Sequence, residues 1–199
     1  MKLRRVLNVA EPGVAQGSTP TRVKLRPTIE RRNDVIGPIR EYDPDLTCTH
    51  RSNDHHPDHR YTEQLVRDSA YVATVPTVRV PTDHLGYNPV IAYLYDEFRE
   101  PPWFDPDVAV PVDGVIDTEL ETPHRHASRT GEWLPYDVGK PDEVPDDEAE
   151  RRAWLRGDRL PDFEAVADRT RDRLVDQYGP EGREVRTPRR PNAASTAAH

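Results

Sequence analysis

The densest group of chemically active side chains lies between positions 49 and 60, in the order Thr-His-Arg-Ser-Asn-Asp-His-His-Pro-Asp-His-Arg. Three of the eight histidines of the chain, His55, His56 and His59, fall between positions 55 and 59. Imidazole and carboxylate groups bind borderline metals such as zinc, and they also transfer protons near neutral pH. This histidine-rich segment is therefore a candidate metal or acid–base site. The alternative is that the three rings simply face water beside a helix.

The elements around this segment are predicted from hydrophobic spacing and capping residues. One helix is predicted from Thr28, a suitable N-cap, to Asp43. A buried strand at Leu46–Thr49 and a second helix from about Asp58 to Ala73 follow, so His59 falls in a first helical turn. In open α/β sheets, ligands bind beyond the carboxyl ends of the strands. The histidine-rich segment begins at such an end.

The rest of the chain continues this alternation of strands and helices. Further strands are predicted at 89–95 and 108–110, and further helices at about 115–129, from 146 onward, and at 161–178. The pattern predicts an α/β protein with a mostly parallel sheet and flanking helices. We expect three segments: an irregular N-terminal lead at 1–24, one domain at 25–178, and a disordered tail at 179–199.

Composition excludes several classes of function. The net charge of −8 argues against a general nucleic-acid-binding protein, because phosphate affinity requires a basic face. Cys48 is the only cysteine, so it forms no internal disulfide and supports no cysteine-based zinc site. No apolar run approaches membrane-spanning length, and no signal-peptide pattern opens the sequence. The expected compartment is the cytoplasm.

The order of residues in the histidine-rich segment resembles the second signature of the PIG-L (LmbE-like) N-deacetylases. The resemblance rests on Thr49-His50, Asn53-Asp54 and His56-Pro57-Asp58-His59-Arg60, and it extends over roughly residues 25–178. These enzymes are zinc-dependent hydrolases that remove acetyl groups from N-acetylglucosamine-type sugars and related amides. The resemblance therefore implies a Rossmann-like fold, a zinc ion, and a small N-acetylated sugar or glycoconjugate as the substrate.

The resemblance also implies roles for single residues. His59 is similar to the zinc ligand of the family, and His56 to the histidine that steadies the tetrahedral intermediate or protonates the leaving amine. Asp58 resembles the aspartate that orients that histidine. His126 resembles the histidine of a later His-x-Ser-Gln segment, although Arg129 replaces the glutamine. The remaining possible neighbours of the site are His50, Asp54 and His55, the last of which has no family role.

One part of the family pattern is missing from the sequence. The family has an early His-Pro-Asp-Asp segment that supplies two zinc ligands and the general base, whereas residues 1–24 contain neither histidine nor aspartate. We therefore expect an N-terminally shortened family member with an exposed sheet edge that can pair with another chain. Two alternatives stay open. One is a catalytically inactive binding or assembly subunit, and the other is a metal-binding protein without catalysis.

Overall fold

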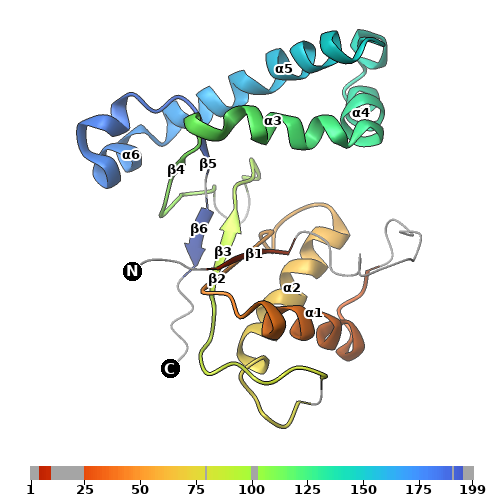
Figure 1. Cartoon of the computed structure of the whole chain (residues 1–199), viewed down its shortest axis with the longest axis vertical. Coiled ribbons are helices and arrows are strands. Elements are labelled where there is room, and N and C mark those ends of the chain that lie inside the picture. The colour runs from red at the N-terminus through yellow and green to blue at the C-terminus, as the bar shows by residue number, and fades with distance from the viewer. Residues whose placement is uncertain (1–4, 10–24, 79, 100–102, 190, 195–199) are drawn as a thin grey trace. The chain divides into compact units, whose positions relative to one another are not determined.

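The chain separates into two compact units in the computed structural model, which describes residues 5–9, 25–78, 80–99, 103–189 and 191–194 (Figure 1). The first unit comprises Met1–Asp107 and Pro191–His199, and the second comprises Val108–Arg190. The sequence predicted one domain over 25–178, and the boundary between the two units falls inside that range.

The first unit is built on a four-stranded sheet with the strand order β1-β2-β3-β6. These strands are β1 (Val6–Asn8), β2 (Leu46–Thr49), β3 (Val90–Leu94) and β6 (Pro191–Ala194). β1, β2 and β3 are parallel, whereas β6 is antiparallel to β3. The predicted mostly parallel sheet is therefore confirmed. β1 pairs with β2 and stands at one end of the strand order.

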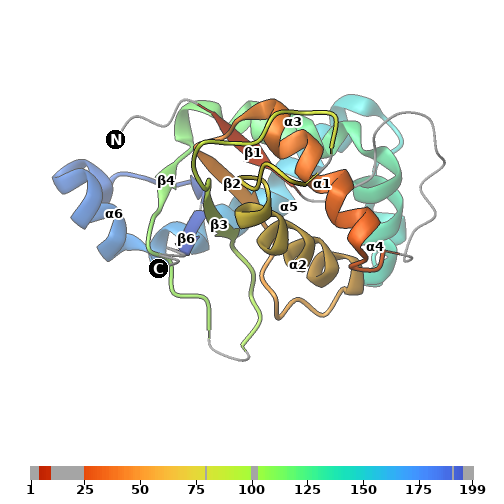
Figure 2. The same ribbon diagram turned by 90° about the horizontal axis from the view of Figure 1, so that it is seen from below.

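Two helices, α1 (Ile29–Tyr42) and α2 (Pro57–Val72), lie side by side next to this sheet (Figure 2). α1 begins where the sequence predicted, because Thr28 Oγ1 accepts a hydrogen bond from Arg31 N at 3.3 Å. The helix ends at Asp43, which has a left-handed φ of 50°. Buried apolar side chains join the two helices in one core: Val35, Ile36 and Ile39 from α1, Leu65 and Val66 from α2, and Ala73 and Leu85 beyond them.

A buried arginine fixes the long loop between α2 and β3. Arg40 is only 6% exposed, and its guanidinium group donates to four backbone carbonyl groups. The acceptors are Ala73 O at 2.9 Å, Val75 O at 2.8 Å, Val78 O at 3.1 Å and Thr82 O at 3.1 Å. One side chain of α1 therefore donates hydrogen bonds to carbonyl groups at four points along this loop.

The second unit is mainly helical. Its longer helices are α3 (Ile116–Arg125), α5 (Glu148–Arg169) and α6 (Arg171–Tyr178), with the short α4 (Leu134–Asp137) and a π-helical turn at Ser128–Trp133. Short 3-10 turns span Asp113–Val115, Pro141–Glu143 and Gly179–Arg183. β4 (Val110–Pro111) pairs antiparallel with β5 (Pro188–Arg189).

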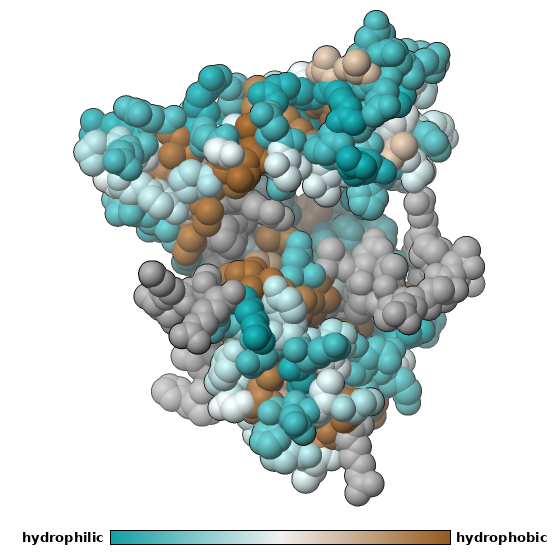
Figure 3. Space-filling model, viewed as in Figure 1, coloured by the Kyte–Doolittle hydropathy of each residue, from teal (hydrophilic) through white to brown (hydrophobic). Residues whose placement is uncertain are grey.

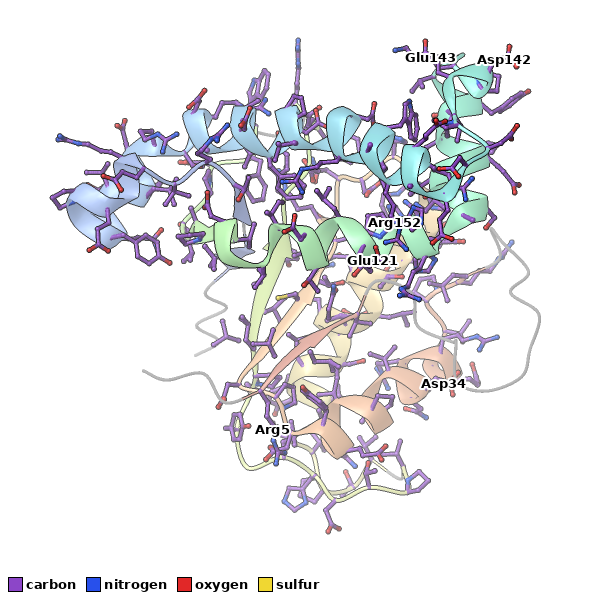
Figure 4. All side chains as sticks on the ribbon, turned by 45° about the horizontal axis from the view of Figure 1, so that its top comes forward. Arg5, Asp34, Glu121, Asp142, Glu143 and Arg152 are labelled. Carbon is purple, nitrogen blue, oxygen red and sulfur yellow. The ribbon has the colours of Figure 1, made fainter. Side chains whose placement is uncertain are left out.

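Charged side chains join α3 to α5. Arg152 pairs with Glu121 and with Glu148, and Arg156 pairs with Asp117. Figure 4 shows Arg152 and Glu121 facing one another from the two helices. The surface along α5 is mostly hydrophilic in Figure 3. None of the helices in the described ranges combines the length and the apolar content needed to span a bilayer.

The helices of the second unit differ from the predicted ones at their ends. α5 continues through Pro161 and ends at Arg169, whereas the sequence predicted a separate helix from 161 to 178. α3 ends at Arg125 rather than near 129. Pro123 lies in its last turn, and Thr130 Oγ1 donates to Pro123 O at 2.7 Å. Proline removes one helical N–H, and the threonine hydroxyl occupies a carbonyl group that helix continuation would have used.

Part of the segment predicted to be disordered has defined structure. Within residues 179–194, one 3-10 turn and the strands β5 and β6 are present, while 195–199 lie outside the described residues. Arg171 Nη1 donates to the carbonyl oxygens of Gly182, Arg183 and Val185. Asp113 accepts from Arg186 N at 2.9 Å. Of the irregular lead predicted at 1–24, the structure describes residues 5–9, which include β1, and residues 10–24 lie outside it.

Candidate metal site

The histidine-rich segment connects the carboxyl end of β2 to the first turn of α2. His50 follows the last residue of β2, and α2 begins at Pro57, whose fixed φ suits the first helical position. His56 precedes it as the N-cap, with an extended backbone at φ −76° and ψ 122°. His59 therefore lies in the first turn of α2, as the sequence predicted, and it faces back toward the strand end.

Three side chains converge at this strand end, and we call them the metal-site triad: His50, Asp54 and His59. Each offers a ligand atom, and these atoms all lie within 4.8 Å of one another. The rings of His50 and His59 are stacked, with centroids 4.0 Å apart and planes 5° from parallel. Two imidazole nitrogens and one carboxylate oxygen form a donor set that can bind a metal of the zinc type.

Asp54 organises the loop between the strand and the helix. Its side chain is largely buried, and Oδ1 accepts from His56 N at 2.8 Å. Oδ2 lies 2.8 Å from His59 Nδ1. Because a carboxylate only accepts, the ring nitrogen donates, and Nε2 of a neutral His59 keeps its lone pair. The backbone carbonyl of Asp54 accepts from Arg60 Nη1 at 2.6 Å, which ties the loop to α2.

His56 lies beside the triad without the partner that the resemblance implies. Its ring centroid is 4.5 Å from that of His59. Its Nδ1 is buried and has no hydrogen-bond partner among the described residues. One oxygen of the Asp58 carboxylate, which was expected to orient this ring, accepts from Leu25 N at 3.3 Å. Buried polar atoms are nearly always hydrogen-bonded in native proteins, so His56 Nδ1 is available to a ligand or a water molecule.

The other two candidate residues have different positions. His55 is exposed, and its ring makes an edge contact with Phe98, with centroids 4.6 Å apart and planes at 75°. His126 belongs to the second unit, where it is exposed and caps the end of α3. Neither contributes a ligand atom to the metal-site triad.

A buried carboxylate one helical turn beyond His59 was not identified from the sequence. Glu63 is 1% exposed, accepts from Tyr93 Oη at 3.1 Å and pairs with Arg67 at 3.3 Å. Burial raises the pKa of the Glu63 carboxyl group. Burial and the nearby Glu63 charge raise the pKa of Tyr93 to about 12, so the phenol stays a donor. The signal was present in the sequence, because Glu63 shares the apolar face of α2 with Val66.

Comparison with known proteins shows a fold and no close relative. No protein-family model matches the chain, and no curated protein matches it. Several solved structures share the fold, and three of them are 11% to 18% identical to this chain in sequence. A 4-carboxy-2-hydroxymuconate hydratase from Pseudomonas putida KT2440 aligns with a TM-score of 0.56 and 11% identity over 89% of this chain and 63% of its own.

The other two neighbours are similar in extent. A conserved protein from Thermus thermophilus aligns with a TM-score of 0.54 and 15% identity, over 88% of this chain and 63% of its own. An N,N'-diacetylchitobiose deacetylase from Pyrococcus horikoshii, complexed with an inhibitor, aligns with a TM-score of 0.51 and 18% identity. The alignment covers 85% of this chain and 52% of the deacetylase.

The chain thus spans between 52% and 63% of the length of these three structures. At 11% to 18% sequence identity, these matches show that the fold is shared and nothing about function. Fold and site together define a Rossmann-like α/β protein with a His-Asp-His group at the carboxyl end of its parallel strands.

Proposed function

We propose that the chain is a zinc-dependent N-deacetylase of the PIG-L type that hydrolyses the acetamide of an N-acetylglucosamine-type sugar or glycoconjugate. The observation that carries this proposal is the convergence of the metal-site triad, His50, Asp54 and His59, at the carboxyl end of β2. The signature-like order of residues around the triad supports it. A deacetylase is also among the structures that share the fold.

The triad fits a catalytic metal in number and type of donors. Catalytic zinc takes three protein ligands and keeps one position for water, and His50, Asp54 and His59 supply two nitrogens and one oxygen. When bound, zinc polarises a carbonyl group and lowers the pKa of its water to about 7. Because the side chains of Asp54 and His59 are only 11% and 22% exposed, their interactions are weakly screened by solvent.

His56 is the residue that we assign to proton transfer. Amide hydrolysis requires a proton for the departing amine, and a histidine titrates in the appropriate range. The ring of His56 stacks at 4.5 Å on that of His59, and its buried Nδ1 has no partner in the described part of the chain. It is therefore close to the triad and able to hold a proton at Nδ1.

The proposal is tested by zinc analysis combined with acetate release from N-acetylglucosamine and N,N'-diacetylchitobiose. We expect one zinc ion per chain, lost in His59→Ala and weakened in Asp54→Asn. His56→Ala should keep the zinc and lose most acetate release, by about 100-fold or more for a lost general acid. His84→Ala is the matched control, because His84 is an exposed histidine in the loop before the amino end of β3.

Other outcomes separate the alternatives. Zinc binding without acetate release would favour a metal-binding protein, and the same samples would then be assayed for hydration of 4-carboxy-2-hydroxymuconate, the reaction of one fold neighbour. A wild-type protein without zinc would overturn the proposal and leave the binding or assembly role. Equal zinc loss in His84→Ala and His59→Ala would also contradict the assigned ligands.

A further inference from the structure

A second polar contact joins the carboxyl ends of β2 and β3 beside the metal-site triad. Arg51 follows His50, and its Nη1 lies 2.8 Å from Oδ1 of Asp96, two residues after the end of β3. The two side chains are only 12% and 13% exposed. A pair so far withdrawn from water is costly to separate, because either charge alone would be left desolvated.

Asp96 uses the same oxygen to shape the chain after β3. Its Oδ1 also accepts from Phe98 N at 3.0 Å, a short side-chain-to-backbone turn. This turn directs the ring of Phe98 to the ring of His55, where the edge contact described above forms. His55 is adjacent to Asp54 and His56, so the turn brings Phe98 against the loop that carries the triad.

Arg51 also contacts the far side of the same segment. Its guanidinium carbon lies 5.5 Å from the centroid of the Phe104 ring, within the range of a cation–π interaction. Phe104 in turn makes an edge contact with Tyr95, with centroids 5.3 Å apart and planes at 86°. One side chain therefore reaches both Asp96 and Phe104.

From these contacts we propose that Arg51 is a positioning residue, which holds Tyr95–Arg99 and Phe104 as an aromatic wall beside the metal-site triad. The wall receives the uncharged, non-reacting part of the substrate, and this role rests on the deacetylase function proposed above. Of the charged groups in and beside this segment, Arg51 and Asp96 neutralise each other. Glu97 accepts from Tyr95 Oη at 3.0 Å, and the guanidinium carbon of Arg99 lies 4.8 Å from the centroid of the Trp103 ring. The wall therefore offers aromatic ring surface, which suits the C–H face of a neutral sugar ring better than an anionic group.

Hydrogen exchange of the free protein tests the positioning role without zinc or turnover. In Arg51→Met, the amide of Phe98 and its neighbours in 95–99 should exchange faster by about tenfold or more, because the turn loses its fixed acceptor. Arg31→Met is the matched control, because Arg31 forms an exposed ion pair with Asp34 at 3.2 Å on α1. Unchanged exchange in Arg51→Met would overturn the positioning role.

The substrate role is tested by kinetics with N-acetylglucosamine and by zinc content. We expect Arg51→Met to keep its zinc and to raise KM by about tenfold with kcat changed much less, the pattern of lost uniform binding. Loss of zinc, or an equal loss of kcat with KM unchanged, would contradict it. An inactive wild type would overturn the deacetylase proposal and the substrate role together, while the exchange experiment would still decide whether Arg51 positions the wall.

Discussion

Glu63 shows how a single buried side chain links stability to pH. Its carboxylate is 1% exposed, and it is held between Tyr93 of β3 and Arg67 of α2. Burial raises its pKa from the model-peptide value of 4.5, so the folded protein holds this proton more tightly than the unfolded chain. The stability that the protonated form contributes is full below pH 4.5 and is lost as pH rises through the raised pKa.

The first prediction follows from the upward direction of the Glu63 pKa shift. Glu63→Gln keeps an oxygen that accepts from Tyr93 and removes the buried charge. The variant should therefore gain stability relative to wild type as pH rises from about 4.5 to 8. Urea unfolding at several pH values measures the difference. Glu41→Gln, at an exposed position on α1, is the control and should show a smaller change. A difference that falls with increasing pH would contradict the burial argument.

At the scale of elements, α1 and the loop after α2 are held together by one residue. Arg40 donates to four backbone carbonyl groups of that loop. In Arg40→Met these buried and partly buried acceptors lose the guanidinium group as a donor, so we expect the free energy of unfolding to fall by about 2–4 kcal/mol. Chemical denaturation measures it, with Arg31→Met on the exposed side of α1 as the control. A loss below about 0.5 kcal/mol, typical of surface substitutions, would contradict the anchoring role.

Elements were predictable from sequence where local rules decide the outcome. The start of α1 at Thr28, the strand at Leu46–Thr49 and the position of His59 in the first turn of α2 were all predicted correctly. Capping and apolar spacing act within a few residues and are therefore visible in the sequence. The continuation of α5 through Pro161 was not predicted, because proline alone is a weak guide when the flanking residues favour a helix.

The site was predictable only in part, because local sequence rules do not determine the path of the loop that brings its residues together. His59 and its neighbours were identified from residue order, but the approach of His50 and Asp54 to His59 depends on the path of the loop between them. That path is set by the contacts of Asp54 with His56 N and Arg60, which no periodic pattern encodes. The hydrogen bond from Leu25 N to Asp58 was not predicted, because Leu25 is 33 residues away in sequence.

At the scale of the whole molecule, each unit has its own buried residues and all three triad residues belong to the first. Leu174 is 0% exposed in the second unit. Leu174→Ala should lower the free energy of unfolding by about 2–5 kcal/mol through the cavity it leaves. The zinc content of the folded protein should stay the same. Thermal unfolding and metal analysis of one sample measure both, and zinc loss from a still-folded variant would show that the site depends on the second unit.

The metal-site triad lies on one uninterrupted piece of chain, from His50 to His59. The entropy lost on closing a loop grows with its length, so a loop this short costs little to close. The donors meet as soon as the end of β2 and the first turn of α2 are formed, before distant strands have paired. Metal present during refolding should therefore speed the folding of this unit, whereas metal added to the folded protein should only stabilise it. Stopped-flow refolding with and without zinc would show whether the metal site forms early and nucleates folding, or forms only after the rest of the unit has folded.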